Sequence, residues 1–134
     1  MKKTTVGALL LPTIALLLEL LPTGITMRFA APPGEPPFLT KTSYFDLLPF
    51  GYGNIAPLLT AILTAAVWVL LVLYLVSRRA TYWKAGKFLS LLAALLSLCP
   101  LLFAAYTVIG GLISLCLFAE SFYLARMQPP APKP

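Results

Sequence analysis

Residues 43–57, SYFDLLPFGYGNIAP, form the one stretch where aromatic, acidic, amide, glycine and proline residues crowd together. It runs directly into the long apolar segment that starts at Ile55. Aromatic rings with polar tips favour the headgroup layer of a bilayer, and Gly51 and Gly53 allow backbone angles that other residues resist. The stretch therefore predicts a structured element at a membrane surface.

The composition around this stretch is typical of an integral membrane protein. Hydrophobic residues make up 60% of the 134 residues and charged residues 10%, and the mean hydropathy is +0.91. These values lie outside the range of soluble domains. Because a spanning helix needs about 20 mainly apolar residues, the chain has room for four spans and no separate soluble domain.

The apolar runs predict an all-α membrane protein, a four-transmembrane-helix bundle in one integral membrane domain, 1–134. The expected spans cover about 5–23, 55–77, 88–106 and 110–126. A long structured extracytoplasmic loop, 24–54, would join the first two spans, and a cytoplasmic loop, 78–87, the next two. We expect a kink at Pro100, a tight turn centred between Thr107 and Val108, and a disordered tail, 127–134.

The first apolar run has two interpretations, a cleaved signal peptide or a retained helix. Signal cleavage requires small residues one and three positions before the cut. A cut after Ala30 places Arg28 in the earlier position, and a cut after Ala31 places Phe29 there. We therefore expect a retained helix.

The basic residues indicate the orientation of the chain. With four spans, all the basic clusters fall on one side: Lys2 and Lys3, four charges within 78–87, then Arg126 and Lys133. The positive-inside rule then predicts a multi-pass protein of the cell membrane with both termini in the cytoplasm. Since these clusters hold eight of the ten basic residues behind the net charge of +6, we expect no nucleic-acid partner.

Few residues of the chain could carry chemistry. Histidine is absent, and the only cysteines, Cys99 and Cys116, lie in apolar runs without a CxxC motif. We expect both to be free thiols that pack between helices at the same depth in the bilayer. The sequence predicts no enzyme, no metal site and no cofactor.

Two acids inside apolar runs are candidate functional residues, because charge within a bilayer is costly. For Glu19 we consider a proton or cation site under the outer loop, or a carboxylate bound by loop amides or by Arg28. For Glu120 the structural alternative is an ion pair with Arg78 or Arg79. The two acids are expected at different depths and out of contact.

Four residues of the aromatic stretch are candidates for binding a ligand or cation. They are Tyr44, Asp46, Tyr52 and Asn54, with the aromatic rings forming a platform. The alternative, which we favour, is that Asp46 caps a short helix starting at Leu47 and that Asn54 caps the second span.

Residues 43–60 and the span pattern resemble those of uncharacterised small four-helix bacterial integral membrane proteins. This resemblance implies the fold and no particular chemistry. Small multidrug transporters also carry a glutamate in the first of four helices, but the similarity ends at Glu19, because those proteins have short loops.

Two functions are consistent with these features. The leading hypothesis is an accessory or scaffold subunit whose aromatic outer loop binds another membrane protein or a lipid. The alternative is an oligomeric transporter or channel for a small solute or ion that uses Glu19. The expected partners are the lipid bilayer and a membrane protein or further copies of the chain.

Overall fold

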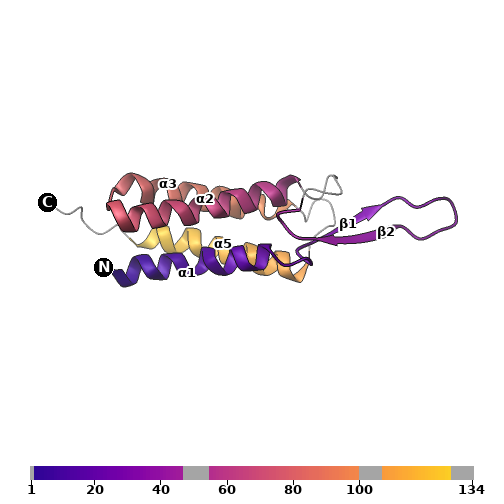
Figure 1. Ribbon diagram of the computed structural model, residues 1–134, viewed down its shortest axis with the longest axis horizontal. Coiled ribbons are helices and arrows are strands. Elements are labelled where there is room, and N and C mark those ends of the chain that lie inside the picture. Colours follow the sequence, from indigo (N-terminus) through magenta and orange to yellow (C-terminus); the bar gives the residue numbers. More distant parts are fainter. Residues whose placement is uncertain (1, 47–54, 100–106, 128–134) are drawn as a thin grey trace.

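The computed structural model describes residues 2–46, 55–99 and 107–127, without the side chains of 2–5 and 27–28. These residues form four helices and a two-stranded hairpin (Figure 1). The elements are α1 (Lys2–Glu19), β1 (Ile25–Phe29), β2 (Phe38–Thr42), α2 (Ile55–Ser77), α3 (Ala80–Leu96) and α5 (Val108–Arg126).

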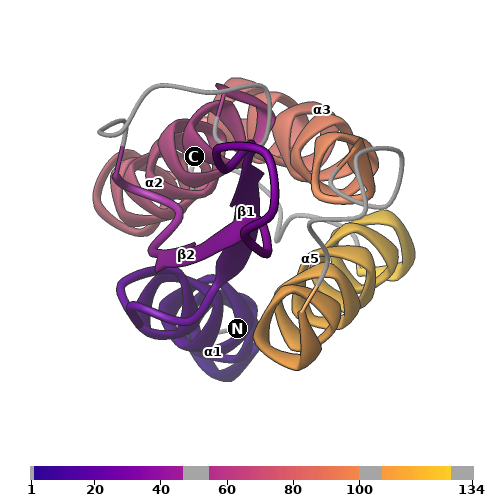
Figure 2. The same ribbon diagram turned by 90° about the vertical axis from the view of Figure 1, so that its right-hand side faces the viewer.

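The four helices form an antiparallel up-and-down bundle. α1 packs against α2 and α5, and α3 packs against the same two helices. Viewed along its axis the bundle is a ring of four, with the hairpin facing the viewer (Figure 2). The start of α1 and the end of α5 lie at the end of the bundle opposite the hairpin (Figure 1). The all-helical bundle predicted from the apolar runs is thus confirmed.

Among the described helices, α2 and α5 are long and apolar enough to cross a membrane, and the apolar part of α1, Val6–Glu19, is shorter. α2 has the bounds predicted for the second span. Its 23 residues extend about 35 Å, which exceeds the bilayer core of about 30 Å. Its inward face is made largely of small and apolar residues at helical spacing, among them Thr60, Ala61, Thr64, Val67 and Leu71.

The basic segment 78–87 is mostly helix, so its prediction as a loop is wrong. The connection between α2 and α3 consists of Arg78 and Arg79. Arg78 adopts a left-handed backbone conformation with φ of 58°, and its N–H donates to the carbonyl of Tyr74 at 2.8 Å. The chain therefore reverses within two residues.

α3 begins early because its first turns bury apolar surface against α2. Trp83 is buried, and its ring meets that of Tyr74 edge-on at 5.1 Å between centroids. Gly86 faces Leu71 one turn further on. The lysines of the segment lie on the exposed face, so the charge is compatible with a helix.

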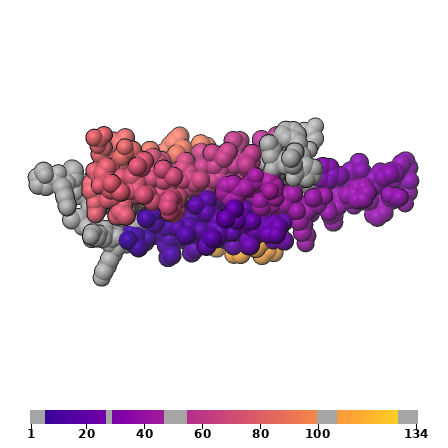
Figure 3. Space-filling view, in the orientation of Figure 1, coloured from indigo at the N-terminus to yellow at the C-terminus, as the bar shows by residue number. Residues whose placement is uncertain are grey.

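The outer loop contains a β-hairpin that the sequence analysis did not predict. β1 and β2 pair antiparallel, from Ile25 opposite Thr42 to Phe29 opposite Phe38. The hairpin extends beyond the end of the bundle (Figures 1 and 3). In its turn, Gly34 has a φ of 95°, a conformation that favours glycine. The order predicted for this loop was placed in its aromatic second half, 43–54, most of which lies outside the described residues, whereas the observed sheet lies in its first half.

The second helical hairpin differs in register from the prediction. α3 ends at Leu96 rather than at 106, and the expected kink at Pro100 lies outside the described residues. Ser114 donates to the carbonyl of Ser97 at 3.4 Å, which places Cys99 about one helical turn from the level of Cys116. Both cysteines are free thiols, as predicted.

Candidate functional site

Two carboxylates lie in the interior of the bundle. Glu19 is the last residue of α1 and Glu120 belongs to α5, and both are fully buried. Glu120 shares the inward face of α5 with residues three or four positions apart, which is the helical repeat of a buried face. These residues are Gly110, Ile113, Ser114, Leu117 and Leu124.

Glu19 is held by a hydroxyl from the neighbouring helix. Thr64 Oγ1 donates to Glu19 Oε1 at 2.9 Å and also contacts the carbonyl of Thr60 at 2.8 Å. Glu19 Oε2 has no hydrogen-bond partner within the described parts of the chain. The described part of the loop does not supply the predicted bond from loop amides to this carboxylate; there the N–H of Tyr44 donates to the main-chain carbonyl of Glu19, at 3.0 Å. The side chain of Arg28 lies outside the description.

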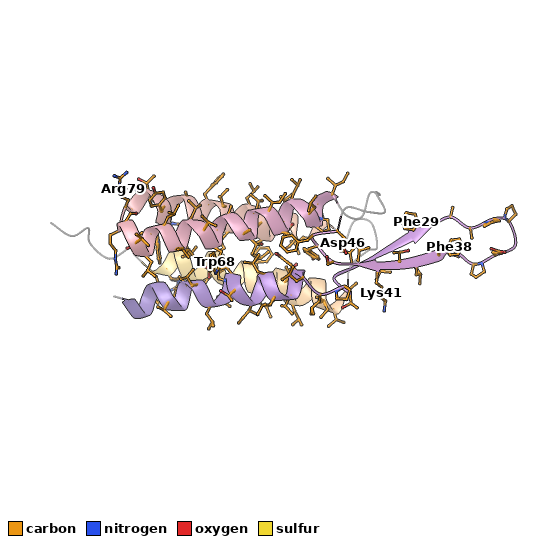
Figure 4. The ribbon with its side chains drawn as sticks, in the orientation of Figure 1. Phe29, Phe38, Lys41, Asp46, Trp68 and Arg79 are labelled. Carbon is orange, nitrogen blue, oxygen red and sulfur yellow. The ribbon has the colours of Figure 1, made fainter. Side chains whose placement is uncertain are left out.

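Glu120 has an even more isolated carboxylate. Neither of its oxygens has a hydrogen-bond partner among the residues that the structure describes. The predicted ion pair with Arg78 or Arg79 is therefore not formed. Arg79 is exposed at the end of the bundle opposite the hairpin (Figure 4). Glu120 thus lies in the interior without a described counter-charge.

The two acids lie at different depths, in agreement with the prediction. Gly7 of α1 packs against the Tyr123 side chain of α5, so Glu120 is level with about position 10 of α1 in this antiparallel pair. Glu19 is about nine residues further along α1. At 1.5 Å per residue the two acids are roughly 14 Å apart along the bundle axis.

The interior of the bundle is mainly apolar, with a few buried hydroxyl groups and, apart from the two acids, no charged side chain among the described residues. Hydroxyl side chains on α2, α3 and α5 are buried, and most of them donate to carbonyls of their own helix. These side chains are Thr60, Thr64, Ser90, Ser97 and Ser114. A further polar contact joins α1 and α2 near the middle of the bundle, where Trp68 Nε1 donates to Thr13 Oγ1 at 3.1 Å (Figure 4).

Tyr44 is buried at the hairpin end of the bundle and does not form an exposed aromatic platform. A Cβ atom on Gly24 would lie 2.9 Å from the Tyr44 ring, and one on Gly110 would lie 3.2 Å from its hydroxyl oxygen. Thr107 Oγ1 donates to the carbonyl of Gly24 at 2.8 Å and accepts from the N–H of Gly110 at 3.1 Å. We call Gly24, Thr107 and Gly110 the Tyr44 seat.

Asp46 is exposed and closes a turn. Its Oδ2 accepts a hydrogen bond from the N–H of Ser43 at 3.0 Å, three residues earlier in the chain. The helix predicted to start at Leu47, and the candidate residues Tyr52 and Asn54, lie outside the described residues. Of the four candidate residues in the aromatic stretch, Tyr44 and Asp46 are the two that the structure describes. Tyr44 is a core residue and Asp46 is a surface turn residue.

The hairpin carries an apolar surface that sequence reasoning missed. Phe38 is 58% exposed and Leu39 60% exposed, and Phe38 pairs with Phe29 at the far end of the strands (Figure 4). The available signal was one short segment with alternating apolar residues, ITMRF, and a second short segment rich in β-favouring residues, FLTKT, on either side of the proline-rich turn. Their length of five residues each is too short for this signal to be distinctive.

The described residues hold no group of three or more histidine, cysteine, aspartate or glutamate side chains that could bind a metal ion. Comparison of the chain with protein-family models, with curated proteins and with solved structures finds no match. We therefore infer function from the geometry of the chain.

Proposed function

We propose that all four described helices lie in a membrane, with both ends of the chain in the cytoplasm and the hairpin outside. The outward faces of these helices carry large apolar side chains, which a water-exposed surface would not favour. Among them are Leu10, Leu17, Ile62, Val69, Val76, Leu91, Leu95, Leu115 and Phe122. The shorter helices α1 and α3 can be accommodated by local thinning of the bilayer.

The charge distribution supports this orientation. The described basic side chains of the helices lie toward the end opposite the hairpin, at Arg78, Arg79, Lys84, Lys87 and Arg126. Basic residues are retained on the cytoplasmic side of a membrane. In intact cells, an impermeant thiol reagent should label a cysteine at the exposed position Glu35 and should not label one at Lys84. The reverse pattern would overturn the orientation.

We further propose that the protein is an accessory membrane protein whose hairpin binds the extracytoplasmic part of another membrane protein. The exposure of Phe38 and Leu39 beyond the bundle carries this proposal. A hairpin of two strands is marginally stable in water and needs a third strand or a packed face for independent stability. The described part of this hairpin is fully buried only near its root, at Ile25 and Thr42, while Phe29 is half-buried and packs against the core cluster that contains Ile25.

The partner that fits this surface best is a protein with an open sheet edge. Among the described residues, β1 and β2 pair only with each other, so each has one edge that can accept an additional strand. Addition of a strand supplies main-chain hydrogen bonds and would also cover the apolar side chains at the far end. A second copy of the chain and a lipid surface are the competing occupants.

A photo-crosslinking amino acid placed at Leu39 tests this proposal in native membranes. We expect one membrane protein to crosslink and to co-purify in stoichiometric amount, and both signals to be lost in Phe38→Ser. The matched control is Val76→Ser, at a position 79% exposed near the other end of the bundle, which should leave co-purification unchanged. Crosslinks only between copies of the chain, or only to lipid, would contradict the proposal.

A second candidate function is transport of a small solute or ion through Glu19. The observation that favours it is the full burial of this carboxylate, with Oε2 unpartnered in the described structure. Acids at membrane depth commonly mark ion pathways. In liposomes containing the purified protein, Glu19→Gln should abolish an ion or proton flux that Glu35→Gln preserves. Absence of flux in the unaltered protein would contradict this candidate.

A further inference from the structure

Two observations distinguish the interior acids from packing residues. Neither oxygen of Glu120 and only one oxygen of Glu19 has a hydrogen-bond partner in the described structure, although both side chains are fully buried. An unpaired carboxylate ion in an apolar interior is strongly disfavoured. A bound proton removes the charge, and it requires neither a cavity nor a set of coordinating ligands.

No described cation compensates for either acid. The basic residues of the α2–α3 connection, α3 and α5 are exposed or half-buried and lie toward the end opposite the hairpin. Other titratable groups on the packed helices are neutral when protonated. The described charged and titratable side chains on the elements packed around the two acids are Tyr44 beside the end of α1, Tyr74 on α2, Arg78 and Arg79 between α2 and α3, Tyr82, Lys84 and Lys87 on α3, Cys99 just after α3, and Cys116, Tyr123 and Arg126 on α5.

We propose that Glu19 and Glu120 are two intramembrane proton-binding sites at separate depths in the bundle. At Glu19 the proton taken from water binds Oε2, the oxygen without a described partner, while Oε1 keeps its bond from Thr64. The site therefore accepts and releases a proton without rearrangement of the α1–α2 contact. At Glu120 either oxygen can bind the proton.

This inference deepens the transport candidate by naming the proton as the ligand and Glu120 as a second site. Proton binding can be measured directly, without any ion flux. A negative result for proton binding is therefore distinguishable from a negative result for transport. It is also independent of the partner proposed for the hairpin. The roughly 14 Å between the sites exceeds a direct hydrogen bond, so each acid titrates as a separate group.

Infrared spectroscopy of the full chain in lipid nanodiscs tests the proposal. The chain contains four acids, so the carbonyl absorptions of protonated carboxyl groups can be assigned by substitution. At neutral pH we expect two such absorptions. Glu19→Gln should remove one and Glu120→Gln the other, while Glu35→Gln, at an exposed position on the hairpin turn, should leave both.

Thr64→Val supplies a second and milder readout. It removes the hydroxyl that donates to Glu19 Oε1, so it should shift the Glu19 absorption and leave that of Glu120 in place. Size-exclusion chromatography identifies any variant that fails to fold, and Glu19→Asp or Glu120→Asp then replaces it, with the absorption retained at a shifted frequency. Absence of both absorptions in the unaltered protein, or their persistence in both Gln variants, would overturn the proposal.

Discussion

The bundle and the hairpin differ in which side chains they bury and which they expose. In the bundle, large apolar side chains face outward and the acids face inward. In the hairpin, the far end exposes Phe38 and Leu39, and burial is confined to the root. The difference indicates that the helices are stabilised by packing against each other, whereas the hairpin depends on its attachment to the bundle. Substitutions at the junction should therefore have larger effects than substitutions at the far end.

The largest effect is expected for Tyr44→Ala. This change removes a fully buried ring from the Tyr44 seat, and loss of a buried aromatic side chain typically costs about 3–5 kcal/mol. Denaturation in mixed detergent micelles measures the free energy of unfolding. The neighbouring Phe45→Ala, at a position 36% exposed, is the control and should cost less than half as much. Equal losses would show that the seat does not fasten the hairpin.

Gly24→Ala should have the next largest effect. Its new Cβ atom would lie 2.9 Å from the Tyr44 ring, and overpacking of this kind costs about 1–3 kcal/mol. Gly86→Ala is the matched control, because its Cβ atom would meet Leu71 at an ordinary 3.8 Å. That control should be neutral or stabilising by up to about 1 kcal/mol. The same unfolding measurement compares the two, and a neutral Gly24→Ala would contradict close packing at the junction.

A smaller loss is expected for Thr64→Val, which removes the side-chain bond to Glu19. Side-chain hydrogen bonds between membrane helices contribute about 0.6 kcal/mol on average. Thr60→Val serves as the control, since the Thr60 hydroxyl donates within its own helix, to Ala56. Unfolding free energies that fall equally in both variants would show that the α1–α2 bond contributes nothing specific.

The smallest effect on stability is expected for Leu39→Ser at the far end of the hairpin. Exposed substitutions usually change the free energy of unfolding by less than about 0.5 kcal/mol, and Leu39 is 60% exposed. The unfolding measurement described for Tyr44→Ala applies here as well. A large loss would mean that the far end packs on the bundle, and the comparison between the two regions would then fail.

The predictability of each element from sequence depended on how local its signal was. α2 was predicted with its observed bounds because a continuous apolar run ends at Arg78. The start of α3 was missed because the charges of 78–87 suggested a loop, whereas the burial of Trp83 depends on a neighbouring helix. The hairpin was missed because the base of the hairpin is held by contacts between residues far apart in the sequence, such as Gly24 and Thr107.

The candidate site shows the same division. Glu19 and Glu120 could be identified from sequence, because acids inside apolar runs are conspicuous. The hydroxyl that donates to Glu19 could not be identified from sequence, because Thr64 is 45 positions away and is one of several hydroxyl residues on its helix. The burial of Tyr44 could not be predicted either. An aromatic residue next to an apolar span suggests a position at the membrane interface, and the contacts of Tyr44 with Gly24 and Gly110 are visible only in the structure.

The bond between Thr107 and Gly24 connects positions 83 residues apart, and this has a consequence for biosynthesis. β1 and β2 leave the ribosome early, but one wall of the Tyr44 seat belongs to the last described helix. The hairpin is therefore not held at this contact until Thr107 and the start of α5 have been translated. A product truncated before α5 would not present the hairpin in the position described above.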